Sequence, residues 1–266
     1  MSLFELKQKI DRNIFRIFNF ASDIGLLLSA RNRQLLANNK IYQNKHQGER
    51  CFILGTGPSL TRLTADQVTA LTKETIFAVN SFYKVSIVDS ITPKYYALMD
   101  NNYWGISKNT FKDVSGRYKE NPPVLITDTR ASQLIPHKIK SILIYAKNYP
   151  VDRMRYDLSE NLSITMNVVS FSLLTAIYMG FKEIYLLGCD YNSFCSRSSN
   201  HCYNDETEIN ELPSYNLAFY LKYYHLTTEF HYAIAILARK KGVKIINLTI
   251  ESLLDAYPTG DLSIIL

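Results

Sequence analysis

Short apolar runs alternate with longer segments of helical composition from residue 49 to the end of the chain. Almost continuous apolar runs of strand length are typical of parallel strands that are buried on both faces. Such runs lie at 50–54, 76–80, 95–100, 124–127, 141–145, 183–187 and 244–248. Residues 170–179 and 215–241 favour helix, and Gly180 is placed to end the first of these helices. The alternation predicts a single Rossmann-like α/β fold with a mostly parallel sheet, flanking helices and right-handed crossovers.

This pattern divides the chain into two regions. Residues 49–266 form the predicted α/β domain, and residues 1–48 precede it as a basic amphipathic segment. Within the α/β region, residues 189–214 are polar and rich in aromatic side chains, so we interpret them as an inserted lid.

Composition narrows the class of protein. The 266 residues are 47% hydrophobic and 20% charged, which excludes a disordered or collagen-like chain. The longest apolar stretch, 15–28, is interrupted by polar residues before it reaches the ~18 residues that span a bilayer. The first residues fit a secretory signal poorly, so we expect a cytoplasmic protein, peripheral at the inner face of the cell membrane. The four cysteines do not resemble a disulfide framework, and Cys195, His201 and Cys202 match no common zinc spacing.

The positive charge is concentrated at the amino terminus. Residues 1–50 hold nine bases and four acids, which accounts for +5 of the formal net charge of +6. Apolar residues recur beside these bases at roughly helical spacing, at Leu3, Leu6, Ile10, Ile14, Ile17, Phe18 and Leu28. Such a segment either lies on an anionic membrane surface or packs on the domain or on a second subunit of a homo-oligomer. We do not expect a nucleic-acid partner, because a protein that binds nucleic acid more often carries its basic side chains on the folded domain.

Four polar clusters follow predicted strands: Gly55-Thr56-Gly57-Pro58-Ser59, Asn80-Ser81, Asp100-Asn101-Asn102 and Gly188-Cys189-Asp190. Ligands of open parallel sheets bind beyond the carboxyl ends of the strands, at the point where the strand order reverses. The glycine-rich turn favours close approach of an anion such as phosphate, although it is neither a Walker loop nor a dinucleotide fingerprint.

No Asp-x-Asp motif is present in the chain. Many enzymes that use nucleotide sugars hold Mg²⁺ or Mn²⁺ with such a motif, so we expect no metal cofactor here. Amides, hydroxyls and helix ends then have to stabilise the leaving phosphate. The insertion supplies suitable groups at Tyr191, Asn192, Ser193, His201 and Tyr203.

The strings Gly55–Leu60, Val79–Tyr83 and Gly180–Asp190 resemble the Campylobacter-type bacterial sialyltransferases. They are also similar to a wider set of surface-polysaccharide and flagellin-glycosylation proteins and to the pterin-diphosphokinase-like fold. The resemblance covers about residues 49–255 and implies a variant of the GT-A-like glycosyltransferase fold. It also implies a CMP-sugar donor and a glycan or lipid-linked glycan acceptor.

The resemblance further implies a set of site residues. Asn80, Gly188 and Asp190 match positions that contact the donor, and Asp100 with Asn101 matches another more loosely. Ser81, Ser170 and Cys189 complete the substrate-binding candidates. The chain departs from the pattern at Thr56, where the family has asparagine, at Asn192, where it has a phosphate-binding tyrosine, and at Thr165, where it has arginine. We expect Tyr203 to replace the missing tyrosine.

Counting back from 243–246 without a gap aligns His225 with the catalytic histidine of that family. Glu229 follows at i+4 and is placed to raise the basicity of the imidazole. A general base takes the proton of the attacking hydroxyl, and His201 is the second candidate for this role. We interpret His231 as structural and His46 and His137 as surface residues.

The sequence therefore predicts a metal-independent, inverting glycosyltransferase of surface-polysaccharide biosynthesis, acting on lipopolysaccharide or capsule. One alternative is a diphosphokinase-like phosphotransferase that uses ATP and Mg²⁺ held by Asp100, Asp190 or Asp205. Another is a nucleotide-binding module without catalytic activity.

Overall fold

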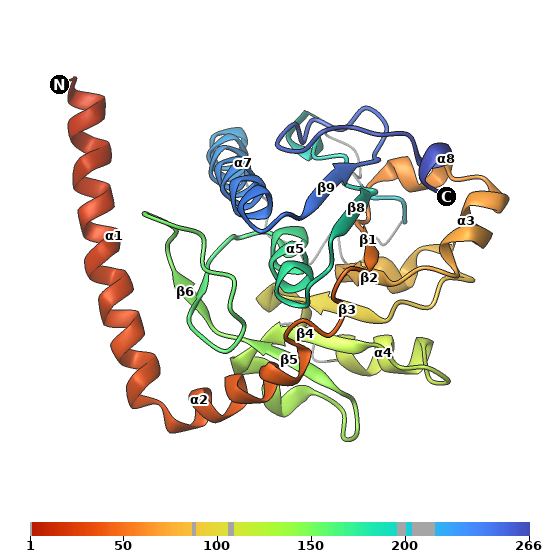
Figure 1. Cartoon of the computed structure of the whole chain (residues 1–266), viewed down its shortest axis with the longest axis horizontal. Helices are drawn as coiled ribbons and strands as arrows, with labels where there is room; N and C mark the ends of the chain where they lie inside the picture. The colour runs from red at the N-terminus through yellow and green to blue at the C-terminus, as the bar shows by residue number, and fades with distance from the viewer. Residues whose placement is uncertain (1, 87–88, 106–108, 196–200, 204–215) are drawn as a thin grey trace.

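A seven-stranded parallel sheet forms the centre of the molecule in the computed structural model (Figure 1). The structure describes residues 2–86, 89–105, 109–195, 201–203 and 216–266. The strands are β1 (Arg50–Leu54), β2 (Ile76–Val79), β3 (Tyr95–Leu98), β4 (Val124–Asp128), β5 (Ser141–Ile144), β8 (Glu183–Leu187) and β9 (Lys244–Asn247). Each of the seven apolar runs is a strand, so the predicted Rossmann-like sheet is confirmed.

The strand order is β5-β4-β3-β2-β1-β8-β9. From β1 the chain builds the sheet outward through β2 to β5, and it then crosses back to place β8 on the other side of β1. The order therefore reverses between β1 and β8, where ligands of such sheets bind.

Helices cover both faces of the sheet. One core lies under α5 (Val168–Tyr178) and α7 (Leu217–Lys240), and the other under α3 (Ala65–Leu71), α4 (Thr110–Arg117) and α8 (Leu262–Ile265). α5 is buried along most of its length, which fits its uniformly apolar sequence. Short 3₁₀ helices connect the elements: η2 (Pro58–Arg62), η3 (Asn80–Lys84), η5 (Asn101–Tyr103), η6 (Thr129–Leu134) and η7 (Ser193–Cys195).

The core extends ahead of residue 49. After α2 (Ala30–Ala37) and η1 (Asn38–Tyr42), the amide of the buried Asn39 donates to the carbonyls of Leu143 and Leu158, each at 2.7 Å. His46 is also buried, with ring nitrogens 2.8 Å from Glu49 Oε2 and 2.7 Å from the Tyr95 hydroxyl. The interpretation of His46 as a surface residue was wrong, because these two partners satisfy its ring inside the fold.

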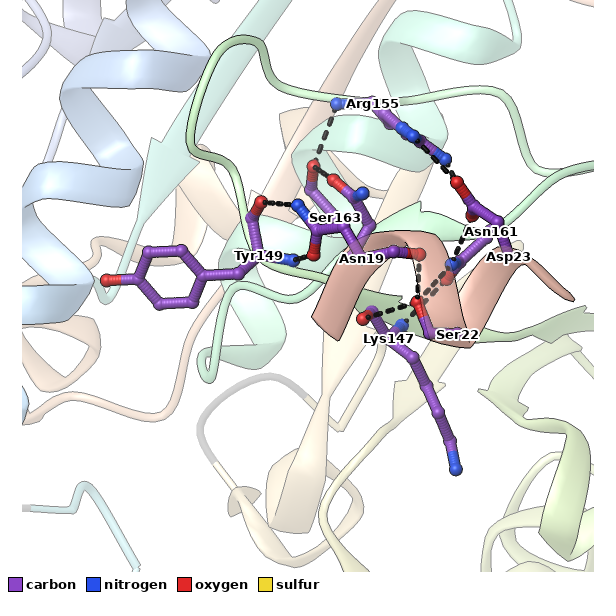
Figure 2. A network of polar contacts seen from close by, with 9 residues as sticks. Asn19, Ser22, Asp23, Lys147, Tyr149, Arg155, Asn161 and Ser163 are labelled. Atoms are coloured by element: carbon purple, nitrogen blue, oxygen red, sulfur yellow. Dashed lines mark hydrogen bonds and ion pairs between the residues drawn. The ribbon is translucent and has the colours of Figure 1, made fainter. Parts of the chain in front are cut away.

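α1 (Leu3–Leu28) stands at one side of the molecule, and Figure 2 shows how its polar face is attached. The Asn19 side chain exchanges two hydrogen bonds with the backbone of Tyr149, at 2.8 and 2.7 Å. Asp23 accepts two hydrogen bonds from Arg155, at 2.8 and 2.9 Å, and one from Asn161 at 2.7 Å. These contacts dock α1 on the small parallel ribbon of β6 (Ala146–Asn148) and β7 (Leu162–Ser163) and its neighbouring loop. No helix in the described ranges is long and apolar enough to cross a membrane.

The turns after β1 and β8 cross at very short range. Gly55 N–H donates to the Leu187 carbonyl at 2.8 Å, and Gly57 N–H donates to the Gly188 carbonyl at 2.9 Å. A Cβ on Gly55 would lie 2.2 Å from the Gly188 carbonyl oxygen, far inside van der Waals contact. Both glycines are therefore required by the packing of one turn against the other.

We predict that Gly55→Ala destabilises the fold by about 1–3 kcal/mol, because backbone has to move to admit the new methyl group. Gly116→Ala is the matched control, since Gly116 lies in α4 with open space around its Cα, and there alanine stabilises by about 0.5–1 kcal/mol. Urea unfolding of both variants measures the difference, and equal stabilities would refute the close crossing.

We predict that Asp23→Ala releases α1 from the ribbon, at a cost of about 1.5–3 kcal/mol for the lost charged hydrogen bonds. Burial raises the pKa of Asp23, but the hydrogen bonds from Arg155 and Asn161 outweigh it and lower the pKa overall. The stabilisation is thus present above the ordinary aspartate pKa and disappears as the pH falls below about 4. Amide hydrogen exchange in α1 measures the release. Asp11→Ala, which removes only the exposed Lys7–Asp11 pair, is the control and changes the exchange little.

Candidate functional site

A pocket of about 140 Å³ opens where the strand order reverses, at the carboxyl ends of β1, β2 and β8. Eleven of the predicted site residues line it: Gly55, Thr56, Gly57, Asn80, Gly188, Cys189, Asp190, Tyr191, Asn192, Ser193 and His201. The start of α5, two residues of α7, Val79 and Leu254 complete the described lining. The structure thus brings three of the four predicted polar clusters to one place.

The glycine-rich turn shapes this pocket, but the N–H groups of its two glycines are not available as donors to a ligand. The N–H groups of Gly55 and Gly57 are already donated to carbonyls of the β8 turn. Asp190 is 9% exposed and accepts from both the N–H and the hydroxyl of Ser59, at 3.0 and 2.8 Å. Ser59 and Asp190 therefore join the two turns, and Ser59 itself lies outside the pocket lining. Burial raises the pKa of the Cys189 thiol to about 12, which keeps it protonated.

Asn80 lines the pocket. Its amide Oδ1 is buried and accepts no hydrogen bond from the described residues. The backbone is left-handed, with φ of 48°, and the Tyr96 hydroxyl holds it by donating to the Asn80 carbonyl at 2.7 Å. The same hydroxyl accepts from the Tyr83 N–H at 2.9 Å. Because buried amide oxygens are seldom left unpaired, this atom is a candidate acceptor for a donor group of a ligand.

The amino terminus of α5 forms the opposite wall. Asn167 is its N-cap, accepting from the N–H groups of Val169 and Ser170 at 2.9 and 3.2 Å. Asn167, Val168 and Val169 all line the pocket, so the positive end of the helix dipole lies beside it. Thr165, which stands where the resembling family has arginine, is buried just ahead of this cap.

His231 on α7 lines the pocket, although the sequence alone suggested only a structural role for this residue. Its ring nitrogens lie 3.2 Å from the Ser170 hydroxyl and 3.0 Å from the Tyr257 hydroxyl. Burial lowers the pKa of His231 to about 3, so the ring is neutral at physiological pH. Since both nitrogens are engaged, His231 orients Ser170 and α5. Ser170 itself is fully buried behind the lining.

Aromatic side chains extend the wall toward the insertion. Tyr191, with φ of 58°, directs its hydroxyl to the Thr227 hydroxyl on α7. The Tyr224 ring packs against Tyr191 and Phe194, with centroids 4.8 Å away in each case. Burial raises the pKa of Tyr191, so the phenol stays neutral. The sequence did not predict Tyr224, or Val168 and Val169 of α5, as residues of the pocket. The i, i+3, i+7 spacing of Tyr224, Thr227 and His231 nevertheless places these three residues on one face of α7.

The described part of the insertion folds back on the β1 turn. The Cys202 N–H donates to the Thr56 carbonyl at 2.9 Å, and His201 Nδ1 lies 3.1 Å from the Thr56 hydroxyl. His201 is exposed and lines the pocket, with its ring stacked on Tyr203 at 5.1 Å. Tyr203 packs beside the second core and is not part of the pocket lining.

The remaining predicted residues lie apart from the pocket. His225 is 68% exposed on α7 and faces Glu229 at 3.8 Å, so the predicted pair exists but does not line the pocket. Asp100 caps η5 by accepting from the Asn102 N–H at 2.8 Å, and neither it nor Asn101 lines the pocket. Ser81 is fully buried. Asp205 lies outside the described residues.

Magnesium, which the phosphotransferase alternative implies, finds no paired carboxylates at this pocket. Within the described ranges, no cluster of three or more His, Cys, Asp or Glu side chains is arranged to hold a metal ion. Both oxygens of Asp190 are engaged by Ser59, and Asp100 does not reach the lining. The residues that the structure describes therefore do not fit a magnesium site here.

Solved glycosyltransferases share this fold. The sialyltransferase CstII from Campylobacter jejuni, in complex with a substrate analogue, cytidine-5'-monophosphate, aligns with a TM-score of 0.51 and 16% identity. The alignment covers 80% of this chain and 85% of CstII. The MAf glycosyltransferase from Magnetospirillum magneticum AMB-1 aligns with a TM-score of 0.50 and 13% identity, over 89% of this chain and 39% of that chain. No curated protein matches the chain.

Residues 29–193 match the family described as 6-hydroxymethylpterin diphosphokinase MptE-like. The matched region runs from the residue before α2 to the start of η7 and includes β1, β2, β8 and α5, which build most of the pocket. Because the match spans more than half of the chain, the protein belongs to the MptE-like family.

Proposed function

We propose that this protein is a glycosyltransferase that moves a sugar from a CMP-linked donor to a hydroxyl of a glycan, with inversion and without a metal ion. The observation that carries the proposal is that one pocket is lined both by Asn80, whose buried amide oxygen has no partner among the described residues, and by the amino terminus of α5. The surface-polysaccharide pathway and a lipid-linked acceptor belong to the same proposal.

The two walls suit the two parts of a nucleotide. Asn80 Oδ1 is an acceptor, so it suits the amino group of cytosine or a ribose hydroxyl. The positive end of the α5 dipole and the Thr56 hydroxyl suit the phosphate. None of the described lining residues is lysine or arginine, and the Asp190 carboxylate in the lining is hydrogen-bonded to Ser59, so neutral donors and the helix dipole have to stabilise the phosphate. The shared fold with CstII, which was solved with CMP, supports this choice of nucleotide.

In the proposed reaction, the acceptor hydroxyl loses its proton to His201, and its oxygen forms a bond to the anomeric carbon. The bond between that carbon and the phosphate oxygen breaks, and CMP leaves toward the α5 terminus. A single displacement of this kind inverts the anomeric centre. We assign the base to His201 because, of the two histidines among the described lining residues, it is exposed whereas His231 is fully buried.

Calorimetry with CMP tests the nucleotide site. Asn80→Gly removes the amide while glycine keeps the left-handed backbone without strain. We expect a loss of about five- to tenfold in affinity, which corresponds to one hydrogen bond of roughly 1 kcal/mol. The control is Asn13→Gly on α1, remote from the pocket, which leaves CMP affinity unchanged. An unaltered dissociation constant for Asn80→Gly removes Asn80 from the site.

Single-turnover rates test the base, using the CMP-sugar and acceptor identified by screening. His201→Ala is expected to reduce the rate by about a hundredfold or more while the melting temperature stays the same. His225→Ala is the paired variant, and its exposed position predicts a near-normal rate. If His225→Ala alone abolishes turnover, the alignment with the family histidine was right and His201 is not the base.

The family description favours one further candidate, a phosphotransferase that uses ATP and Mg²⁺. Thermal shift with CMP, and with ATP in the presence and absence of Mg²⁺, separates the two. A shift with CMP alone supports glycosyl transfer, and a shift that requires both ATP and Mg²⁺ supports phosphotransfer.

A further inference from the structure

One face of α1 carries large apolar side chains that no other part of the described structure covers. One row recurs every seven residues, at Leu3, Ile10, Ile17 and Ile24. A second row, three residues further on, holds Leu6, Asn13, Phe20 and Leu27. The exposed fractions of the apolar members range from 39% at Leu6 and Ile24 to 86% at Leu3.

The spacing of these rows is that of a coiled-coil seam. The first row occupies the a positions of a heptad and the second occupies the d positions. A period of seven keeps the a and d side chains facing a partner helix along its whole length. Three further exposed apolar residues of α1, Ile14, Phe18 and Leu28, lie outside these two rows.

The body of the protein holds this seam outward. The opposite face of α1 is docked through Asn19 and Asp23, as Figure 2 shows, and the Phe15 ring stacks on Tyr149 at 3.8 Å. Arg16 adds an ion pair to Asp152 at 2.6 Å. The helix is therefore fixed in orientation before any partner arrives, which lowers the entropy lost on association.

We propose that α1 pairs with α1 of a second copy of this chain, so that two molecules form a parallel dimer through the a/d seam. The proposal is independent of the function proposed above. Isoleucine at three of the four a positions, with leucine at two of the four d positions, favours two parallel strands. In a parallel pair the Asn13 side chains of the two copies lie opposite each other at a d position, where their amides can exchange hydrogen bonds.

Seven apolar seam side chains are available to a partner, and the smallest specific interfaces bury about 1,200 Å² in total, or about 600 Å² on each copy. The helix of 26 residues extends about 39 Å, which provides more than three heptads of contact.

The charges of α1 favour a second copy over a lipid surface. Attraction to an anionic membrane relies on basic side chains that face the headgroups. Arg12 and Arg16 both lie against Asp152, at 3.9 and 2.6 Å, and Lys7 pairs with Asp11 at 2.7 Å. One carboxylate serves both arginines, so these contacts offset part of the basic charge of α1. Asn13 also interrupts the apolar face, which is unfavourable in lipid and useful in a helix pair.

Sedimentation velocity on the full chain, from about 1 to about 100 µM, tests the proposal. We expect a dimer for the natural protein and a loss of at least about a hundredfold in dimer affinity for Ile17→Glu, which places a charge in the seam. Ile41→Glu is the matched control, because Ile41 is 74% exposed and Ile17 is 71% exposed, but Ile41 lies on η1 outside the seam. Because both side chains are exposed, both variants are expected to keep the melting temperature of the natural protein.

Two results would overturn the proposal. One is a natural protein that stays monomeric over the whole concentration range. The other is a dimer that Ile17→Glu leaves intact, which would place the interface elsewhere. Flotation with vesicles of phosphatidylglycerol and phosphatidylcholine is run in parallel. A monomer that floats with these vesicles and loses this property in Ile17→Glu would assign the seam to the membrane instead.

Discussion

The turns after β1 and β8 approach each other so closely that side chains are excluded from the contact. Gly55 and Gly57 lie directly against the Gly188 carbonyl, and Asp190 then accepts two hydrogen bonds from Ser59 to hold the turns together. This crossing is the floor of the pocket, and it occurs where the strand order of the sheet reverses. The glycines that look like a phosphate-binding loop are thus needed first for packing. The chemistry of the pocket comes from what surrounds the crossing.

Those surroundings are neutral and held in place by buried hydrogen bonds. Tyr96 fixes the left-handed backbone of Asn80, while Asn167 caps α5 and His231 orients Ser170 behind it. In a site of low dielectric, oriented amides and a helix dipole stabilise an anion without a net positive charge. Among the described residues the Asn80 amide oxygen has no partner, and a buried acceptor without a partner is unfavourable until a donor pairs with it.

The sequence predicted the sheet well, because buried parallel strands are short apolar runs and the polar residues after them mark its ligand-binding edge. The sequence predicted less about the sides of the pocket that helices α5 and α7 form. Asn167 lies outside the predicted helix, so the cap that brings α5 to the pocket went unrecognised. His225 and His231 lie on different faces of α7. Counting along the sequence without a gap does not show which of these faces meets the pocket. His46 was taken for a surface residue because its partner Tyr95 is distant in sequence. The role of His225 as the general base stays a prediction.

A crystal structure of the protein with CMP tests the central claim most directly. We expect the nucleotide at the β1–β8 crossing, with a donor of the cytidine on Asn80 Oδ1 and the phosphate at the amino terminus of α5. A second pocket lies beside it, lined by residues of η2 and by 248–252 and 259–262 after β9. CMP bound in that second pocket, or no CMP bound at saturating concentration, would contradict this expectation.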